Sequence, residues 1–393
     1  MRRNSLLIMV VAALGIAAIT PETMIGAMTG SGLIAKAAAA EAAATDVSQQ
    51  GARQQSEAAK ANVISDKLNI GAQILASESK LLSSVIVMHQ GSLVHESYYN
   101  GAKADGLHDF RSASKSLTGL MFGVALHDGY FNSEYDKVLP LFKDYEPLLY
   151  PSAEKSAMSF FDLLSMTNPL ECDDMNNFSA GNEERMYLRK DWLRFFFDLP
   201  SRANPPWEAP MEKQPFGRDF SYCTAGISIT AAAIERASGK RLSDYADAAL
   251  LKPIGVGETQ WLYSATGITQ GGGGLRIAPR DFLKIGELIL NKGRWGDKQL
   301  LPAEWIAKSL AAYSESMPEL NASYGLTFWQ FPYEVKGKKI NAFAAAGNGG
   351  NYLFIVPELK LAAVIAATAY NTPYMHKQSQ GIFSAIVLPA IVD

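Results

Sequence analysis

The sequence has few of the residues that build disulfide scaffolds and metal sites. Only two of its 393 residues are cysteines, Cys172 and Cys223, and only five are histidines. They form no Cys-x-x-Cys pair, no metal-type Cys/His spacing and no His-Glu-x-x-His motif, so we expect neither a metal site nor a metal cofactor. Two cysteines can pair in an oxidising compartment or remain buried thiols in a reducing one, and the sequence leaves both alternatives open.

The chain also lacks a large excess of charge of either sign. It contains 36 Lys and Arg residues against 39 Asp and Glu residues, a net charge of −3. A nucleic-acid or anionic-membrane partner favours a basic excess, so we expect neither. With 48% hydrophobic and 19% charged residues, the composition is that of a globular protein long enough for one large domain or two.

The apolar run near the N-terminus, Leu6 to Ile19, is shorter than the roughly 20 residues that a membrane-spanning helix needs. It follows the basic start Met1-Arg2-Arg3 and precedes a small-residue stretch, Ala35 to Ala44, which is the layout of a secretory signal peptide. We predict that residues 1–41 are a signal peptide and that residues 42–65 are a tether, either loose or helical. The mature protein would then be periplasmic or secreted, without a membrane span.

Strand patterns lie near both ends of the folded part. Residues 83–101 read as two strands around Gln90-Gly91, and residues 351–368 as two strands around Pro357-Glu358, followed by a helix. Because their connections are short, these strands should be antiparallel. The middle of the chain is rich in helical patterns. We predict an α/β (α+β) fold, with an antiparallel sheet flanked by helices formed by residues 66–140 and 270–393 and a mostly helical domain at 141–269.

Ser112 and Lys115 lie three residues apart at the start of a predicted helix, whose apolar stripe begins at Leu117. A serine in the first turn has a free N–H, and the helix dipole there favours an oxyanion. The dipole and burial would lower the pKa of the Lys115 amine, which could then accept the Ser112 proton. The pair is therefore a candidate nucleophile and base, or alternatively two surface residues at helical spacing.

The same Ser-x-x-Lys pattern occurs twice more, at Ser77/Lys80 and Ser152/Lys155. A pattern this short is expected by chance about once or twice in a chain of this length. Both of these pairs lie in polar surroundings, typical of solvated helix ends. Only Ser112 precedes a sustained apolar stripe.

Three motifs resemble those of serine hydrolases of the β-lactamase and penicillin-binding-protein class. In chain order they are "SASKSLTG", "LLSMTNPL" and "FSYCTAGISI". The likeness is strongest to class C β-lactamase-like esterases and aminohexanoate-oligomer hydrolases, and it spans about residue 75 to the C-terminus. It implies a β-lactamase-like fold and an acyl-enzyme formed on Ser112 with Lys115 as its base, without a cofactor.

The family's second motif is Tyr-x-Asn, and here it reads Tyr222-Cys223-Thr224. The resemblance implies that Tyr222 shares the Ser112 proton and relays it to the leaving group. The alternative is a buried structural tyrosine. Thr224 replaces the usual asparagine, so the hydrogen bond of that residue to Lys115 or to substrate is shortened or lost. A disulfide between Cys172 and Cys223 would hold Tyr222 in place.

The third motif, usually Lys-Thr-Gly, departs furthest, because Gly347-Asn348-Gly349 stands in its place. By resemblance, Asn348 and Gly349 would border the substrate, and the Gly350 N–H would be an oxyanion donor opposite the Ser112 N–H. The missing lysine would have paired with a substrate carboxylate, which favours a neutral ester or amide. The glycine run at residues 271–274 lacks the ending of a phosphate loop, and by resemblance it borders the active site.

These observations predict an exported serine hydrolase that cleaves small carboxylic esters or amides through an acyl-enzyme on Ser112. One alternative is a β-lactamase or D-amino-peptidase-type activity. Another is a catalytically silent homologue that binds cell-wall material or peptides.

Overall fold

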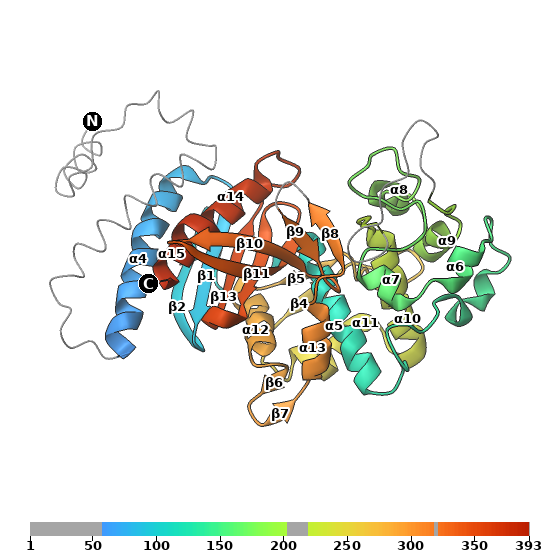
Figure 1. Ribbon diagram of the computed structural model, residues 1–393, viewed down its shortest axis with the longest axis horizontal. Coiled ribbons are helices and arrows are strands. Elements are labelled where there is room, and N and C mark those ends of the chain that lie inside the picture. Colours follow the sequence, from blue (N-terminus) through green and yellow to red (C-terminus); the bar gives the residue numbers. More distant parts are fainter. Residues whose placement is uncertain (1–56, 203–218, 318–320, 393) are drawn as a thin grey trace.

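The computed structural model describes residues 57–202, 219–317 and 321–392, so the predicted signal peptide and residues 42–56 of the tether lie outside the described residues. Its centre is an eight-stranded sheet in the order β2-β1-β13-β12-β11-β10-β9-β8 (Figure 1). All of its strand pairs are antiparallel. The strands are β1 (Leu82–His89), β2 (Ser92–Tyr98), β8 (Ser314–Met317), β9 (Ala322–Tyr324), β10 (Trp329–Val335), β11 (Lys338–Gly347), β12 (Asn351–Val356) and β13 (Leu361–Ala367).

The sheet joins both ends of the described chain, which confirms the predicted antiparallel sheet. Strand β1 pairs with β2 through the turn at Gln90-Gly91 and with β13 on its other side. Both turn residues have positive φ, 52° and 77°, a conformation that glycine adopts without steric cost. The second hairpin, β12 and β13, turns at Pro357–Leu359.

Helices cover both faces of the sheet, because successive side chains of a strand point to opposite sides. On one face, Leu353 of β12 meets Gly286 of helix α12 (Pro279–Leu290). On the other face, the Phe354 ring stacks on Phe383, and the Tyr352 hydroxyl bonds to His376 of α14 (Met375–Ile382). Both faces are therefore buried, and β12 and β13 are buried along their whole length.

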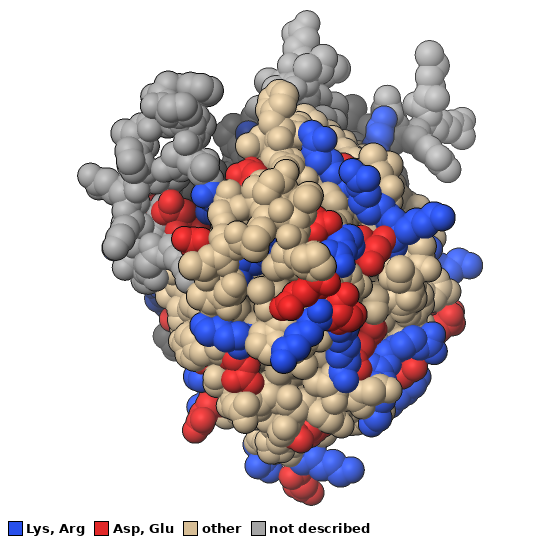
Figure 2. Space-filling model, turned by 90° about the vertical axis from the view of Figure 1, so that its right-hand side faces the viewer, with Lys and Arg blue, Asp and Glu red and all other residues tan. Residues whose placement is uncertain are grey.

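The remaining elements complete the molecule. They are α4 (Glu57–Glu78), α5 (Ser114–His127), α6 (Ala153–Ala157), α7 (Phe160–Leu164), α8 (Glu183–Tyr187), α9 (Trp192–Phe197), α10 (Thr224–Ser238), α11 (Leu242–Ala246), α13 (Ala303–Ser309), α15 (Leu388–Ile391), β3 (His108–Asp109), β4 (Thr259–Trp261), β5 (Leu275–Ile277), β6 (Arg294–Trp295) and β7 (Lys298–Gln299). Helices α6 to α9 gather on one side of the molecule, beyond α5 and away from α4 (Figure 1). On that side of the molecule, Lys and Arg are interspersed with Asp and Glu, as Figure 2 shows.

Two segments add detail to the sequence-based expectation. Helix α4 begins at Glu57, so residues 57–65 have the helical one of the two forms predicted for the tether. Farther along α4, Leu68 and Leu75 are buried against the core, and a packed helix extends readily through an alanine-rich start. Strand β4 lies within the range predicted to be mostly helical, and it joins a small sheet in the order β3-β5-β4. Of the helices described, none has the length and apolar character to cross a membrane.

Helix α5 is buried along most of its length and requires glycine where α13 crosses it. Trp305 of α13 donates a hydrogen bond from Nε1 to the Gly119 carbonyl at 2.9 Å. A Cβ on Gly123 would overlap the same indole ring. The close approach of the two helices therefore depends on the absence of a side chain at Gly123.

We expect Gly123→Ala to lower the free energy of unfolding by about 1–3 kcal/mol, because the indole must move out of a packed core. Urea denaturation would measure the change. Gly106→Ala is the matched control, since Gly106 is exposed and the nearest atom to its added Cβ is the Lys103 oxygen at 3.3 Å. Equal stability of the two variants would contradict the prediction.

Candidate active site

Ser112 lies in a single 3₁₀ turn, Arg111–Ala113, directly before α5. The sequence predicts the helix start itself at this position, and the structure adds a separate tight turn. Gly347, at the end of β11, packs against the turn. A Cβ on Gly347 would overlap the Phe110 carbonyl and would lie 3.1 Å from the Ser112 nitrogen. The bare backbone of Gly347 therefore borders the backbone of the candidate nucleophile.

Lys115 is almost completely buried, with 1% of its surface exposed. Its Nζ donates to Ser112 Oγ at 2.8 Å and to the Gly272 carbonyl at 2.6 Å, and both acceptors are neutral. Burial lowers the pKa of the Lys115 amine, and the charges of Glu183 and Asp174 oppose that shift only in part. The environment thus favours the neutral amine, which is the form that can take a proton from Ser112.

The carbonyl that contacts Lys115 belongs to the glycine run at residues 271–274. A Cβ on Gly272 would lie 2.7 Å from Thr224 Cγ2, and one on Gly271 would lie 2.7 Å from Thr118 Oγ1. Side chains at these positions would push the loop away from Lys115. The run of glycines was the signal in the sequence, but nothing in it showed which carbonyl meets the lysine.

Tyr222 completes a cluster of three side chains that come from separate segments. Tyr222 is 9% exposed, and the centre of its ring lies 4.8 Å from Lys115 Nζ. Burial raises the pKa of the Tyr222 phenol well above its usual value, the nearby Tyr324 adds to the rise, and a hydrogen bond with the Ser112 side chain opposes it. Ser112, Lys115 and a protonated Tyr222 are therefore together, as the motifs predict.

The two rival Ser-x-x-Lys pairs are placed differently. The fully buried Lys155 donates from Nζ to the carbonyls of Phe197 and Leu199, while Ser152 Oγ accepts a hydrogen bond from the Lys155 N–H at the start of α6. Ser77 donates to the Ile74 carbonyl on the exposed surface of α4. One pair thus caps backbone groups and the other belongs to a solvated helix.

The residues predicted to border the substrate form the turn between β11 and β12. The side-chain amide of Asn348 donates to Asn371 Oδ1 at 2.6 Å, and its oxygen accepts from the Asn371 N–H. The Gly349 N–H donates to Met375 Sδ, and the missing side chain of Gly350 faces Met375 and Ser379 of α14. Gly347, which the sequence did not single out as an oxyanion residue, is the one that packs on Ser112. The oxyanion role of the Gly350 N–H stays a prediction.

Thr224 begins α10, and its N–H donates to Asp174 Oδ2 at 2.6 Å. The other carboxylate oxygen of Asp174 accepts from the Glu183 N–H at 2.8 Å. Burial and the charge of Glu183 raise the pKa of Asp174 to about 7, although Lys115 and the Thr224 contact lower it. Sequence reasoning missed both acids, because single carboxylates in a loop carry no recognisable spacing.

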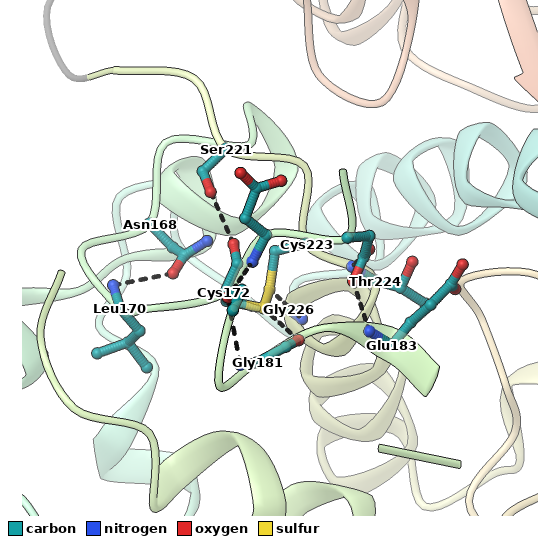
Figure 3. Close-up of a disulfide and its surroundings, with 12 residues drawn as sticks. Asn168, Leu170, Cys172, Gly181, Glu183, Ser221, Cys223, Thr224 and Gly226 are labelled. Carbon is teal, nitrogen blue, oxygen red and sulfur yellow. Dashed lines mark hydrogen bonds between the residues drawn. A yellow bond between two sulfur atoms is a disulfide. The ribbon is translucent and has the colours of Figure 1, made fainter. Parts of the chain in front are cut away.

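Cys172 and Cys223 form a disulfide next to this cluster (Figure 3). Ser221 Oγ donates to the Cys172 carbonyl at 2.7 Å, so the two segments also meet through a hydrogen bond. The bridge therefore fastens the Tyr222 segment to the loop that carries Asp174. The described part of the chain brings together no group of three or more His, Cys, Asp or Glu residues suited to a metal ion.

Comparison with known proteins places these features in a family. The chain is 21% identical over 238 residues to the 6-aminohexanoate-dimer hydrolase of Paenarthrobacter ureafaciens, a match that spans 60% of this chain and only 59% of that protein. Its fold is similar to a structure described as a 6-aminohexanoate-dimer hydrolase from Bacillus anthracis, with a TM-score of 0.64, 20% identity, and 82% of this chain and 83% of that one covered. It is also similar in fold to EstCE1, a hydrolase with promiscuous acyltransferase activity, at a TM-score of 0.64 and 14% identity over 85% of this chain and 99% of that one.

The match to a family model covers most of the described chain. Residues 82–385 match the model of the Beta-lactamase family, a range that contains Ser112, Lys115 and Tyr222. The chain therefore belongs to the Beta-lactamase family and has the β-lactamase-like fold that the motifs predict.

Proposed function

We propose that this protein is an exported serine hydrolase that cleaves small carboxylic esters or amides through an acyl-enzyme on Ser112. The observation that carries the proposal is the hydrogen bond between the buried Lys115 Nζ and Ser112 Oγ, with Tyr222 beside both groups. A nucleophile held within hydrogen-bond distance of a neutral base is the arrangement that acyl transfer needs.

In the proposed mechanism, Ser112 Oγ attacks the substrate carbonyl carbon while the Lys115 amine takes the hydroxyl proton. The resulting tetrahedral oxyanion would be held by backbone N–H groups, that of Ser112 among them. The bond to the leaving group then breaks, and Tyr222 relays the proton to the departing alcohol or amine. Water next adds to the acyl-enzyme, its proton passes back through the same groups, and the carboxylic acid leaves with Ser112 restored.

The choice of esters or amides rests on what the third motif lacks. The turn Gly347-Asn348-Gly349 has no lysine to pair with a substrate carboxylate, and Asn348 is engaged with Asn371. A β-lactam or a peptide ending in a free carboxylate would lose that charge interaction. The similar proteins described as a 6-aminohexanoate-dimer hydrolase and as a hydrolase with promiscuous acyltransferase activity support hydrolysis through acyl transfer as the reaction class.

Export to the periplasm or the medium is part of the proposal and rests on the signal-peptide pattern of residues 1–41. The disulfide between Cys172 and Cys223 supports it, because such bonds persist in oxidising compartments and are rare in the cytosol.

A fluorophosphonate probe tests the nucleophile directly. On protein that lacks residues 1–41, we expect one adduct on Ser112, located by intact mass and peptide mapping. Ser112→Ala should remove it, whereas the matched control Ser152→Ala should keep it, because Ser152 caps α6. An unlabelled but folded wild-type protein would overturn the proposal in favour of a silent binding homologue.

The lowered pKa of Lys115 predicts the pH dependence of the reaction. Because the base must be neutral, kcat/KM for a small ester should rise with pH through the Lys115 pKa, at a lower pH than a solvent-exposed lysine would give. Lys115→Arg keeps a permanent charge, so it should lose about 10²–10⁴-fold in kcat/KM.

The control for that variant is Lys80→Arg, at the exposed Ser-x-x-Lys pair, which should leave kcat/KM unchanged. If Lys115→Arg kept the wild-type rate and pH profile, Lys115 would not be the base.

A further inference from the structure

Asp174 holds the segment that carries Tyr222 from both sides of Cys223. Its own N–H donates to the Tyr222 carbonyl at 2.8 Å, and its Oδ2 accepts from the Thr224 N–H at 2.6 Å. The disulfide joins the residue between them, Cys223, to Cys172, two positions before Asp174. Three consecutive residues are thus fastened to one short loop, and Figure 3 shows the bridge between Cys172 and Cys223.

The second carboxylate oxygen fixes Asp174 itself. Asp174 Oδ1 accepts from the Glu183 N–H, which belongs to the first turn of α8. The carboxylate therefore links the start of α8 to the start of α10. A negative charge at the N-terminus of α10, a helix of 15 residues, is also favoured by the helix dipole.

Asp174 acts on the reacting groups by charge as well. The titratable groups that interact with it are Glu183 and Tyr187 of α8, Lys115 of α5 and Tyr222 before α10. Its negative charge favours the ammonium form of Lys115 and thereby opposes the effect of burial. Asp174 thus has a geometric link to Tyr222 and an electrostatic one to Lys115.

A purely structural cap would lack these links, and the chain contains one for comparison. Asp191 accepts hydrogen bonds from the N–H groups of Leu193 and Arg194 at the start of α9. Its other bonded partner is Tyr145, and α9 carries none of the candidate catalytic residues. The two aspartates therefore share a capping role and differ in what the capped segment holds.

We propose that Asp174 is a positioning residue. It holds the Tyr222–Thr224 segment in place, so that the Tyr222 hydroxyl stays hydrogen-bonded to the Ser112 side chain and the Tyr222 ring stays beside Lys115. The inference rests on the proposed function. In this chain the position of the family's second-motif asparagine is held by Thr224, and its backbone N–H, rather than a side-chain amide, connects the motif to the loop.

The test compares Asp174→Ala, Asp174→Asn and the control Asp191→Ala by the rate of fluorophosphonate labelling at Ser112, by kcat and KM for a p-nitrophenyl ester, and by Tm. Asp174→Ala should slow labelling and lower kcat by about tenfold to 10²-fold with little change in KM, because a displaced tyrosine misaligns the reacting groups. Asp191→Ala should lower Tm and, well below Tm, leave the labelling rate unchanged.

Asp174→Asn keeps an oxygen that can accept from the Thr224 N–H but removes the charge. It should retain most of the labelling rate, and the acid limb of its kcat/KM profile should move to lower pH. The direction follows because the loss of a neighbouring negative charge lowers the Lys115 pKa further, so that the neutral amine persists at lower pH.

Two results would overturn the inference. One is wild-type labelling in Asp174→Ala. The other is a loss in both Asp174 variants that merely follows a fall in Tm with an unshifted pH profile, which would make Asp174 a cap like Asp191. A wild-type protein that takes no label at Ser112 would instead overturn the proposed function itself.

Discussion

The buried amine of Lys115 is the group around which the site is arranged. A lysine removed from water loses the hydration of its charge, so burial lowers its pKa and makes it available as a base. Its two hydrogen bonds go to neutral oxygens, Ser112 Oγ and the Gly272 carbonyl. Neither oxygen carries the negative charge that would stabilise the ammonium form as a carboxylate does. The acids Asp174 and Glu183 act on it as well, so their charges moderate the shift. The balance between burial and these two charges sets the working pH of the site.

The fold supplies this environment through close approaches of backbone. Gly272 brings a carbonyl to Lys115, Gly347 brings the end of β11 to Ser112, and Gly123 brings Trp305 against α5. In each case a Cβ would occupy space that a neighbouring group already fills. Glycines that look unremarkable in the sequence thus determine how tightly the sheet, the helix and the loop enclose the reacting groups.

Where this chain departs from the family motifs, backbone groups make contacts that the resemblance assigns to side chains. Where the resemblance implies an asparagine, Thr224 offers its N–H to Asp174, and the Gly272 carbonyl serves as an acceptor for Lys115. Where it implies a lysine, the bare backbone of Gly347 packs against the turn that carries Ser112. A site built in this way keeps the proposed nucleophile and base, and it lacks the cation that, by resemblance, would pair with a substrate carboxylate.

The local patterns of the sequence were enough to predict the two terminal hairpins and the placement of Ser112 and Lys115 before an apolar stripe. Tyr222 followed from the order of the motifs. These features depend on neighbours within a few residues, and such neighbours can be read directly from the chain.

Only the tertiary structure shows what the lysine of each Ser-x-x-Lys pattern contacts. Lys115 and Lys155 are both buried, but one reaches Ser112 and the other reaches backbone carbonyls of Phe197 and Leu199. The roles of Asp174, Gly272 and Gly347 likewise depend on contacts between segments far apart in the chain. Such contacts are set by how sheet, helices and loops pack together, and that packing is a property of the whole fold rather than of any short stretch of sequence.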